Sequence, residues 1–197
     1  MKQRKASRHR KTTETDINVA LNLDGQGKYD IKTTIPFLDH MLELFSKHSL
    51  IDLKIRAKGD THIDDHHLVE DLAITLGLAI SDALGDKKGI QRYGFFLLPM
   101  DESLSYVAID LSGRAWIDYD APGFKKDYWK TFDLDLVEDF FQAIGSACRM
   151  NLHIKLLKGR NNHHMAEGMF KAFAKALSMA VAKDQRYKGM PSTKGSL

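Results

Sequence analysis

Cysteine, excess charge of one sign and long apolar runs are all scarce in this sequence, and each scarcity excludes a class of protein. One cysteine, Cys148, stands among 197 residues, which excludes an intrachain disulfide and favours a reducing compartment. No apolar run approaches the ~20 residues that span a bilayer, and no signal-peptide core follows Met1. We therefore expect a cytoplasmic protein with no membrane partner, although a plastid protein stripped of its transit peptide would look the same.

The net charge is only +3, and much of the excess lies in residues 1–11, which read MKQRKASRHRK. This balance does not imply a nucleic-acid surface, and we expect residues 1–11 to form a flexible basic leader. Hydrophobic residues make up 43% of the chain. A chain of this length can bury roughly 70% of its unfolded surface, as one compact domain or two small half-domains.

An internal repeat organises the rest of the chain. Residues 14–31 align with residues 102–119 without a gap, and each stretch predicts two strands around a Gly-containing tight turn. A short amphipathic helix, an alternating strand and a longer helix follow in each half. The expected helices are 36–48, 64–84, 134–150 and 161–183, and the expected later strands are 51–57, 151–157 and an additional one at 93–98.

The repeat predicts an α+β fold made by tandem duplication, with half-repeats at residues 12–90 and 91–190. Neither half can bury its own apolar face, so the helices of both halves should pack together with the sheets outside. We expect helices sandwiched between two four-stranded sheets. Residues 191–197 are expected to be a flexible tail unless something orders them.

The two long helices begin with the same pattern, His-His-x-x-Glu. Its first histidine and its glutamate are four residues apart, so they share one helix face and can hold one metal ion together. The second histidine points about 100° away and can reach across to the metal of the other half. The chelating pairs are His66 with Glu70 and His163 with Glu167, and the crossing histidines are His67 and His164.

Duplication is what makes this pattern informative. One such pattern at an exposed helix start is more often solvated surface, but duplicated paired histidines preserve no core. The repeat also offers each site a fourth ligand, His40 in the first half and its counterpart Asp139 in the second. Imidazole and carboxylate ligands without thiolate suit Mn²⁺, Fe²⁺, Co²⁺ or Zn²⁺, and near-octahedral coordination with open positions favours Mn²⁺.

Several motifs resemble the imidazoleglycerol-phosphate dehydratase family over residues 12–197. They are FLDHM at 37–41, GDTHIDDHH at 59–67, LVED at 68–71, NHH at 162–164 with Glu167, FKAFA at 170–174 and STKG at 192–195. The resemblance implies a carbon–oxygen hydro-lyase that converts D-erythro-imidazole glycerol phosphate to imidazole acetol phosphate in histidine biosynthesis. It also implies two Mn²⁺ ions per active site and a homo-oligomeric 24-subunit shell with active sites between subunits.

The same resemblance implies two ligand sets, which the repeat relates by exchanging the halves. One manganese would be held by His40, His67, His163 and Glu167, and the other by His66, Glu70, His164 and Asp139. Many family members have histidine where this chain has Asp139. Aspartate can still bind Mn²⁺, but its side chain is shorter and charged, so this metal is expected to bind differently.

The resemblance also implies which residues contact the substrate. Glu14 is the first choice for the proton-transfer base, and its repeat partner Glu102 is the alternative; Glu70 and Glu167 are the other catalytic carboxylates. The phosphate contacts are Arg92, Arg114 and, in a substrate-contacting tail, Ser192 and Lys194. The ligands His40, His66, His67 and His163 would also line the substrate site, as would His48.

The chemistry implied is Lewis-acid and template catalysis. Two metals on the ring nitrogens would favour the imidazolate, loss of the hydroxyl would give a diazafulvene-like intermediate, and a carboxylate would remove the adjacent proton.

Other functions remain open at this point. A dimetal phosphomonoesterase could use the same ligands and arginines. A metal-storing or metal-sensing shell would carry structural sites, and mutation of its arginines would be neutral. A nucleic-acid role resting on residues 1–11 is the weakest alternative.

Overall fold

The computed structural model describes residues 4–124, 128–129 and 132–195. Its first sheet has the strand order β1-β2-β4-β3, and its second has the order β5-β6-β10-β7. The first half contains β1 (Lys5–Lys11), β2 (Thr15–Asn22), β3 (Tyr29–Lys32), α1 (Pro36–Ser49), β4 (Asp52–Gly59) and α2 (His66–Leu84). The second half contains β5 (Tyr93–Met100), β6 (Ser103–Asp110), β7 (Trp116–Asp120), α3 (Leu136–Cys148), β10 (Asn151–Lys158) and α4 (Asn162–Val181).

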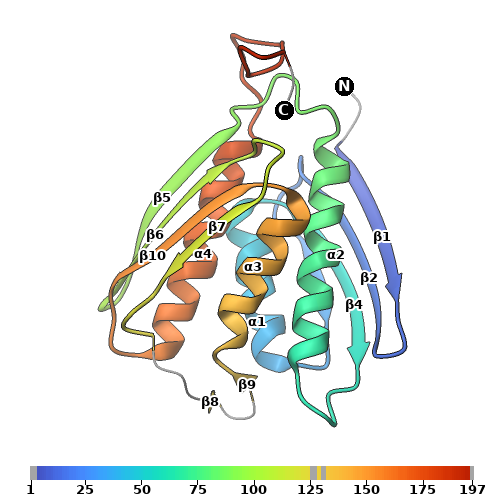
Figure 1. Ribbon diagram of the computed structural model, residues 1–197, viewed down its shortest axis with the longest axis vertical. Helices are drawn as coiled ribbons and strands as arrows, with labels where there is room; N and C mark the ends of the chain where they lie inside the picture. The colour runs from blue at the N-terminus through green and yellow to red at the C-terminus, as the bar shows by residue number, and fades with distance from the viewer. Residues whose placement is uncertain (1–3, 125–127, 130–131, 196–197) are drawn as a thin grey trace.

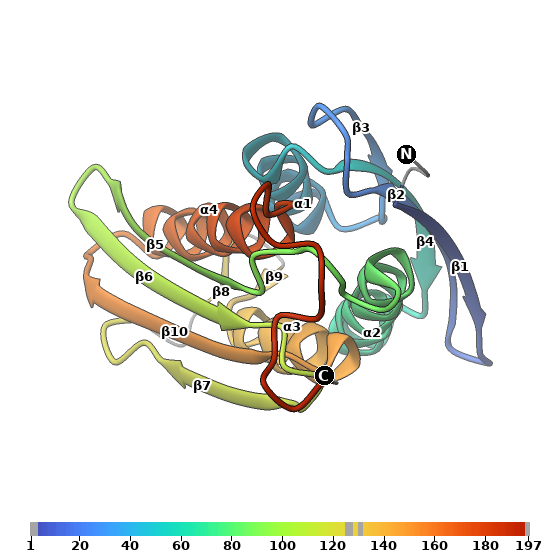
Figure 2. The ribbon, with the colours of Figure 1, turned by 90° about the horizontal axis from the view of Figure 1, so that it is seen from above.

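The four helices lie between the two sheets (Figure 1), and the view from above shows the same layers (Figure 2). Helices α1 and α2 contact the first sheet, whereas α3 and α4 contact the second. Across the middle, α2 packs on α3 and α1 packs on α4. This arrangement confirms the predicted α+β sandwich of two four-stranded sheets.

Alternating burial explains how each sheet covers the helices. In β2, Ile17, Val19 and Leu21 are buried while Asn18 and Ala20 are exposed, because successive strand residues face opposite sides of a sheet. The buried side of β2 faces α2. The sequence pattern therefore fixes which face of the sheet meets the helices.

Aromatic side chains join the two halves in one core. Phe45 of α1 stacks on Phe173 of α4 with ring centroids 5.7 Å apart, and Phe141 of α3 lies 4.8 Å from Phe170 and 5.5 Å from Phe173. Aromatic pairs of this kind contribute about 0.5–1.5 kcal/mol each beyond the area they bury. The halves therefore share one hydrophobic core.

The expectation of a flexible leader is wrong for Lys5–Lys11, which form β1. This strand pairs antiparallel with β2. Its charges are neutralised by α2, because the Arg8 guanidinium donates to Asp82 and the Nε of Arg10 donates to Asp71 at 2.8 Å. With β1 as the counterpart of β5, each half contributes four strands to its large sheet.

The expected tight turn does not pair the two strands that flank it. β4 lies between them, antiparallel to β2 and parallel to β3. The Asp52 carboxylate, at the start of β4, accepts hydrogen bonds from the backbone N–H groups of Gln26 and Lys28 at 2.8 and 3.0 Å. The turn is thus fixed to β4, and α1 provides the crossover that parallel strands need.

Two short strands, β8 (Tyr128–Trp129) and β9 (Phe132–Asp133), pair with each other and were not expected from the sequence. The described helices include none that is long and apolar enough to cross a membrane.

Candidate active site

Three side chains from two helices converge at the start of α4. The Nε2 atoms of His40 and His163 lie 2.9 and 2.8 Å from the same carboxylate oxygen, Oε1 of Glu167. The ligand atoms of the three residues all lie within 4.8 Å of one another. Two imidazoles and a carboxylate, with no thiolate, form a donor set that suits Mn²⁺ and related divalent ions. The residues therefore fit the metal that the resemblance implies.

Glu167 is ionised although it is buried. Burial alone would favour the neutral acid, but hydrogen bonds from Lys171, His40 and His163 outweigh it and lower the pKa of Glu167 to about 2. A buried carboxylate that stays charged at neutral pH is a competent metal ligand. Lys171 lies four residues after Glu167 on the same helix face, a spacing that is visible in the sequence although its role was not predicted.

Polar side chains accept backbone hydrogen bonds at the start of both long helices, beside the histidine pairs. The Asn161 side chain accepts hydrogen bonds from the backbone N–H groups of His163 and His164, at 2.9 and 3.4 Å. At the start of α2, the Asp64 carboxylate accepts from the backbone N–H of His66 at 2.9 Å. These contacts satisfy helix N–H groups that have no partner within the helix. Each long helix therefore begins next to the residues that would bind metal.

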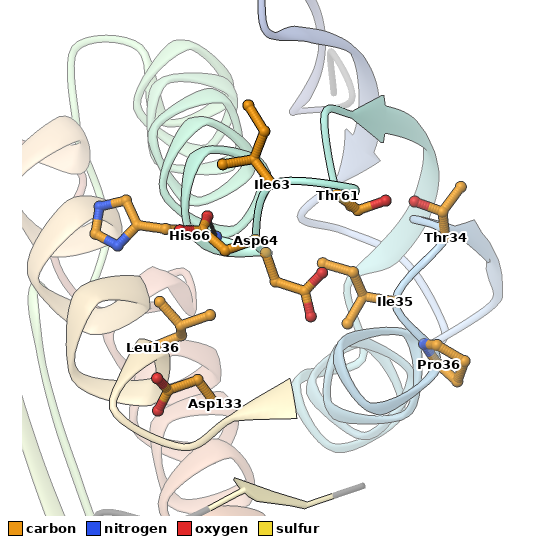
Figure 3. A pocket seen from close by; sticks show the side chains of 10 residues that line it. Thr34, Ile35, Pro36, Thr61, Ile63, Asp64, His66, Asp133 and Leu136 are labelled. Carbon is orange, nitrogen blue, oxygen red and sulfur yellow. Dashed lines mark hydrogen bonds between the residues drawn. The ribbon is translucent and has the colours of Figure 1, made fainter. Parts of the chain in front are cut away.

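The pseudo-equivalent cluster of the first long helix is more open. The Nδ1 of His66 lies 3.5 Å from a carboxylate oxygen of Asp139 on α3, so the structure brings these two expected ligands together. Glu70 is exposed one helical turn further along α2. His66 also lines a cavity of about 610 Å³ with Ile63 and Leu136 (Figure 3).

The two crossing histidines are each bound by a carboxylate of their own half. The Nδ1 of His67 lies 3.1 Å from Asp60 and 3.9 Å from Glu14. The Nδ1 of His164 lies 2.8 Å from Glu102. Such carboxylates hold the ring of a metal-binding histidine and leave its Nε2 for the metal.

Hydrogen bonding also shifts the ionisation of these groups. The Asp60 carboxylate raises the pKa of His67, and Glu102 raises that of His164. In return, the pKa of Glu102 falls to about 2, because it accepts hydrogen bonds from His164 and from the backbone of Asn161. No short spacing in the sequence indicates the role of Asp60, because its contact with His67 is made only by the fold.

The four-ligand sets inferred from the sequence are not assembled within one chain. Among the residues that the structure describes, His67 does not belong to the group formed by His40, His163 and Glu167. His67 and His164 were expected to reach the metal of the other half. Each instead contacts a carboxylate beside its own helix. Each chain thus presents two incomplete clusters and two separately held histidines.

The expected phosphate contacts gather where α4 ends. The Arg92 guanidinium binds both carboxylate oxygens of Asp110, at 2.7 and 3.0 Å, and donates to the carbonyl of Pro191 at 2.8 Å. The expected flexible tail is residues 191–197, of which residues 196–197 lie outside the described part of the chain. Residues 191–195 form turns that include Ser192 and the exposed Lys194.

Arg114 belongs to the same end of the molecule. Its side chain is exposed on the turn before β7, and the Asn151 side chain donates to its carbonyl at 2.8 Å. The turn is joined to Arg92 through the backbone, since the N–H of Leu111 donates to the Arg92 carbonyl at 3.1 Å.

Metal-binding and phosphate-binding candidates lie at opposite ends of the chain. The backbone N–H of Arg92 donates to the carbonyl of Ala180 at the far end of α4, whereas His163 is in the first turn of that helix. At 1.5 Å per residue, the helix separates His163 from Ala180 by about 25 Å. Figure 1 shows the tail at the top and the starts of α2 and α4 at the bottom.

His48, near the end of α1, is half-buried. Burial lowers its pKa, and the charges of Lys171 and Lys175 lower it further. His48 is therefore neutral near pH 7, although the nearby charge of Glu167 acts to raise its pKa.

Known proteins are similar in sequence to this chain over its full length. A family model described as imidazoleglycerol-phosphate dehydratase matches residues 33–177. The chain belongs to the imidazoleglycerol-phosphate dehydratase family. Relatives with that name from Endomicrobium trichonymphae and Desulforamulus reducens are 59% and 56% identical, each over 100% of both chains. Family membership confirms the enzyme class expected from the sequence, a hydro-lyase that dehydrates imidazole glycerol phosphate in histidine biosynthesis.

Solved structures of imidazoleglycerol-phosphate dehydratases have the same fold. The Staphylococcus aureus protein is 39% identical with a TM-score of 0.82, covering 91% of this chain and 99% of its own. The Pyrococcus furiosus protein, solved in complex with (S)-C348, is 35% identical with a TM-score of 0.83, covering 96% and 100%.

Proposed function

We propose that this chain carries out the family reaction with two Mn²⁺ ions per active site, and that each site combines residues from different copies of the chain. The observation that carries this proposal is the separation of about 25 Å between the metal-binding and phosphate-binding ends of α4. Imidazole glycerol phosphate is a small molecule that cannot span that distance. A neighbouring copy must therefore bring its phosphate-binding end to the metal-binding end of the first.

The incomplete metal clusters support the same proposal. His40, His163 and Glu167 would hold one ion, and His66, Glu70 and Asp139 the other, with His67 and His164 completing sites on neighbouring copies. When bound, the metals supply Lewis-acid stabilisation of charge on the imidazole ring. The remaining chemistry belongs to the side chains of the protein.

Glu14 is the better candidate for the proton-transfer base. Glu102 is already occupied, because it accepts hydrogen bonds from the His164 ring and from the backbone N–H of Asn161, and its pKa of about 2 makes it a weak base. The Glu14 side chain is 49% exposed and lies 3.9 Å from His67. It can therefore reach a substrate proton close to the metals.

At the other end of the substrate, charge recognition falls to Arg92, Arg114 and Lys194, with Ser192 as a neutral donor. Guanidinium groups bind phosphate oxygens in pairs. Binding of the phosphate would fix the reacting carbons relative to Glu14, and such positioning lowers the barrier by removing unproductive orientations.

A closed homo-oligomer such as the 24-subunit shell would bring the two ends together around symmetry axes. The outer face of β5 offers apolar area for such contacts, since Tyr93, Phe95 and Leu97 are all more than half exposed. Exposed apolar patches on soluble proteins commonly mark interfaces.

The decisive experiment measures turnover of imidazole glycerol phosphate by metal-stripped protein, with and without added Mn²⁺. Activity restored only by the metal supports both the reaction and the cofactor. A protein that binds two metals per chain and leaves the substrate unchanged would contradict the proposal. Release of inorganic phosphate instead of water would favour the phosphomonoesterase alternative.

A further inference from the structure

Arg92 has a backbone conformation that residues other than glycine rarely adopt. Its φ is 70°, in the left-handed region that disfavours residues other than glycine. Two backbone hydrogen bonds hold this conformation. The Arg92 N–H donates to the Ala180 carbonyl, and the Arg92 carbonyl accepts from the Leu111 N–H. Strain of this kind persists where the surrounding structure imposes it, often at functional sites.

The Arg92 side chain is committed to two partners. The Asp110 carboxylate accepts hydrogen bonds from two of its N–H groups, and the Pro191 carbonyl accepts from a third. A guanidinium has five N–H groups, so two remain for a ligand. The side chains of Arg92 and Asp110 are only 13% and 20% exposed, where water weakens a charged hydrogen bond less than it does at the surface.

The first half contains a similar arginine–carboxylate pair, which holds a different segment. Arg4 precedes β1 as Arg92 precedes β5, and its guanidinium pairs with Asp24 and donates to the Val181 carbonyl. The carbonyl of Arg4 also accepts from Leu23, as that of Arg92 accepts from Leu111. The two arginines thus make similar contacts but hold different segments: Val181 ends α4, whereas Pro191 lies in the tail. Their carboxylates stand at different positions of the repeat, because Asp110 aligns with Asn22 and Asp24 aligns with Ser112.

We propose that Asp110 is a positioning residue for the phosphate end of the substrate. Its carboxylate fixes the plane of the Arg92 guanidinium, which in turn fixes Pro191 and so the adjacent turn that carries Ser192 and Lys194. Asp110 touches no substrate itself. This inference rests on the proposed function, because it assumes that the tail meets the substrate phosphate.

The test compares Asp110→Asn with Asp24→Asn in full-length, Mn²⁺-loaded protein. The first substitution leaves one side-chain oxygen as acceptor where Arg92 had two. The second makes the same change at Arg4, which holds Val181 at the end of α4 instead of Pro191 in the tail. We expect Asp110→Asn to raise KM for imidazole glycerol phosphate about tenfold with kcat within about twofold. The inhibition constant for inorganic phosphate should rise by a similar factor. Asp24→Asn should leave both unchanged.

Hydrogen exchange supplies a readout that does not depend on turnover. Backbone amides of residues 187–195 should exchange faster in Asp110→Asn than in Asp24→Asn, because the tail loses its fixed anchor. A larger change, Asp110→Ala, should increase the effect; if that variant fails to fold, Asp110→Asn still decides the matter.

Three results would overturn the inference. One is an unchanged phosphate inhibition constant and KM in Asp110→Asn, and another is an equal rise in Asp24→Asn. The third is a fall in kcat with KM unchanged. Failure of the proposed function is distinct from all of these, since the unsubstituted protein would then not turn over the substrate although the tail exchange still responded to Asp110→Asn.

Discussion

Two variants that are each inactive alone should restore activity when they assemble together. His163→Ala removes a proposed metal ligand, and Arg92→Ala combined with Lys194→Ala removes proposed phosphate contacts. Each chain then keeps one functional end. Because about 25 Å of helix separates these ends, an active site that needs both must take them from different chains.

The size of the recovery follows from mixing statistics. In an equal random mixture, the metal-binding end of a site comes from the phosphate-deficient chain half the time, and its phosphate-binding end comes from the metal-deficient chain half the time. About one quarter of the sites in the symmetric assembly should therefore carry both intact ends. The two chains are co-expressed, loaded with Mn²⁺, and assayed for initial rate at substrate well below KM.

A matched control uses two variants at the same end. His163→Ala and Glu167→Ala alter one cluster that a single chain builds, so their mixture has no chain with both residues and should stay inactive. The reasoning is refuted if the first mixture is no more active than the two separate proteins. It is equally refuted if the control mixture recovers about a quarter of the activity.

Three further predictions concern packing, chemistry and metal binding. Gly94→Ala should lower the free energy of unfolding by about 1–3 kcal/mol in urea titrations, because the new methyl group would overlap the Ala176 carbonyl of α4; an unchanged midpoint would contradict this packing. Cys148 should resist iodoacetamide in the native protein at pH 8, since burial raises its pKa to about 12 and the thiolate is the reactive form. Rapid labelling without unfolding would refute that. Asp139→His should tighten binding of the second Mn²⁺ by about tenfold, or ~1.4 kcal/mol, in calorimetric titration, because the longer imidazole reaches further towards His66; weaker binding would show that aspartate is the better ligand there.

Helix periodicity made part of the site predictable from sequence. His163 and Glu167 share a helix face because they are four residues apart, and the structure places both on one side of α4 with His40. The repeat added the equivalent pair in α2. Local spacing was enough for these contacts, because regular helix geometry converts spacing directly into position.

Contacts between distant segments could not be predicted in the same way. The β1 strand looks like a solvated basic terminus because the acids that neutralise Arg8 and Arg10 lie 74 and 61 residues away, on α2. Likewise, the contact of Arg92 with Pro191 spans 99 residues. Such pairs depend on strand register and on how helices pack, and neither appears as a short spacing.

The duplication of the chain matches one part of the proposed substrate, and the tail, which has no counterpart in the first half, matches the other part. An imidazole ring presents two nitrogens, and the chain presents two helix starts, related by the repeat, that carry the proposed metal ligands. A phosphate is found at one end of the substrate only. Correspondingly, α2 is followed by a direct link into β5, whereas α4 is followed by the tail that Arg92 holds. Arg4 is also paired with a carboxylate, that of Asp24, but holds Val181. Under the proposed function, the symmetric elements therefore correspond to the ring, and the departure from symmetry corresponds to the phosphate.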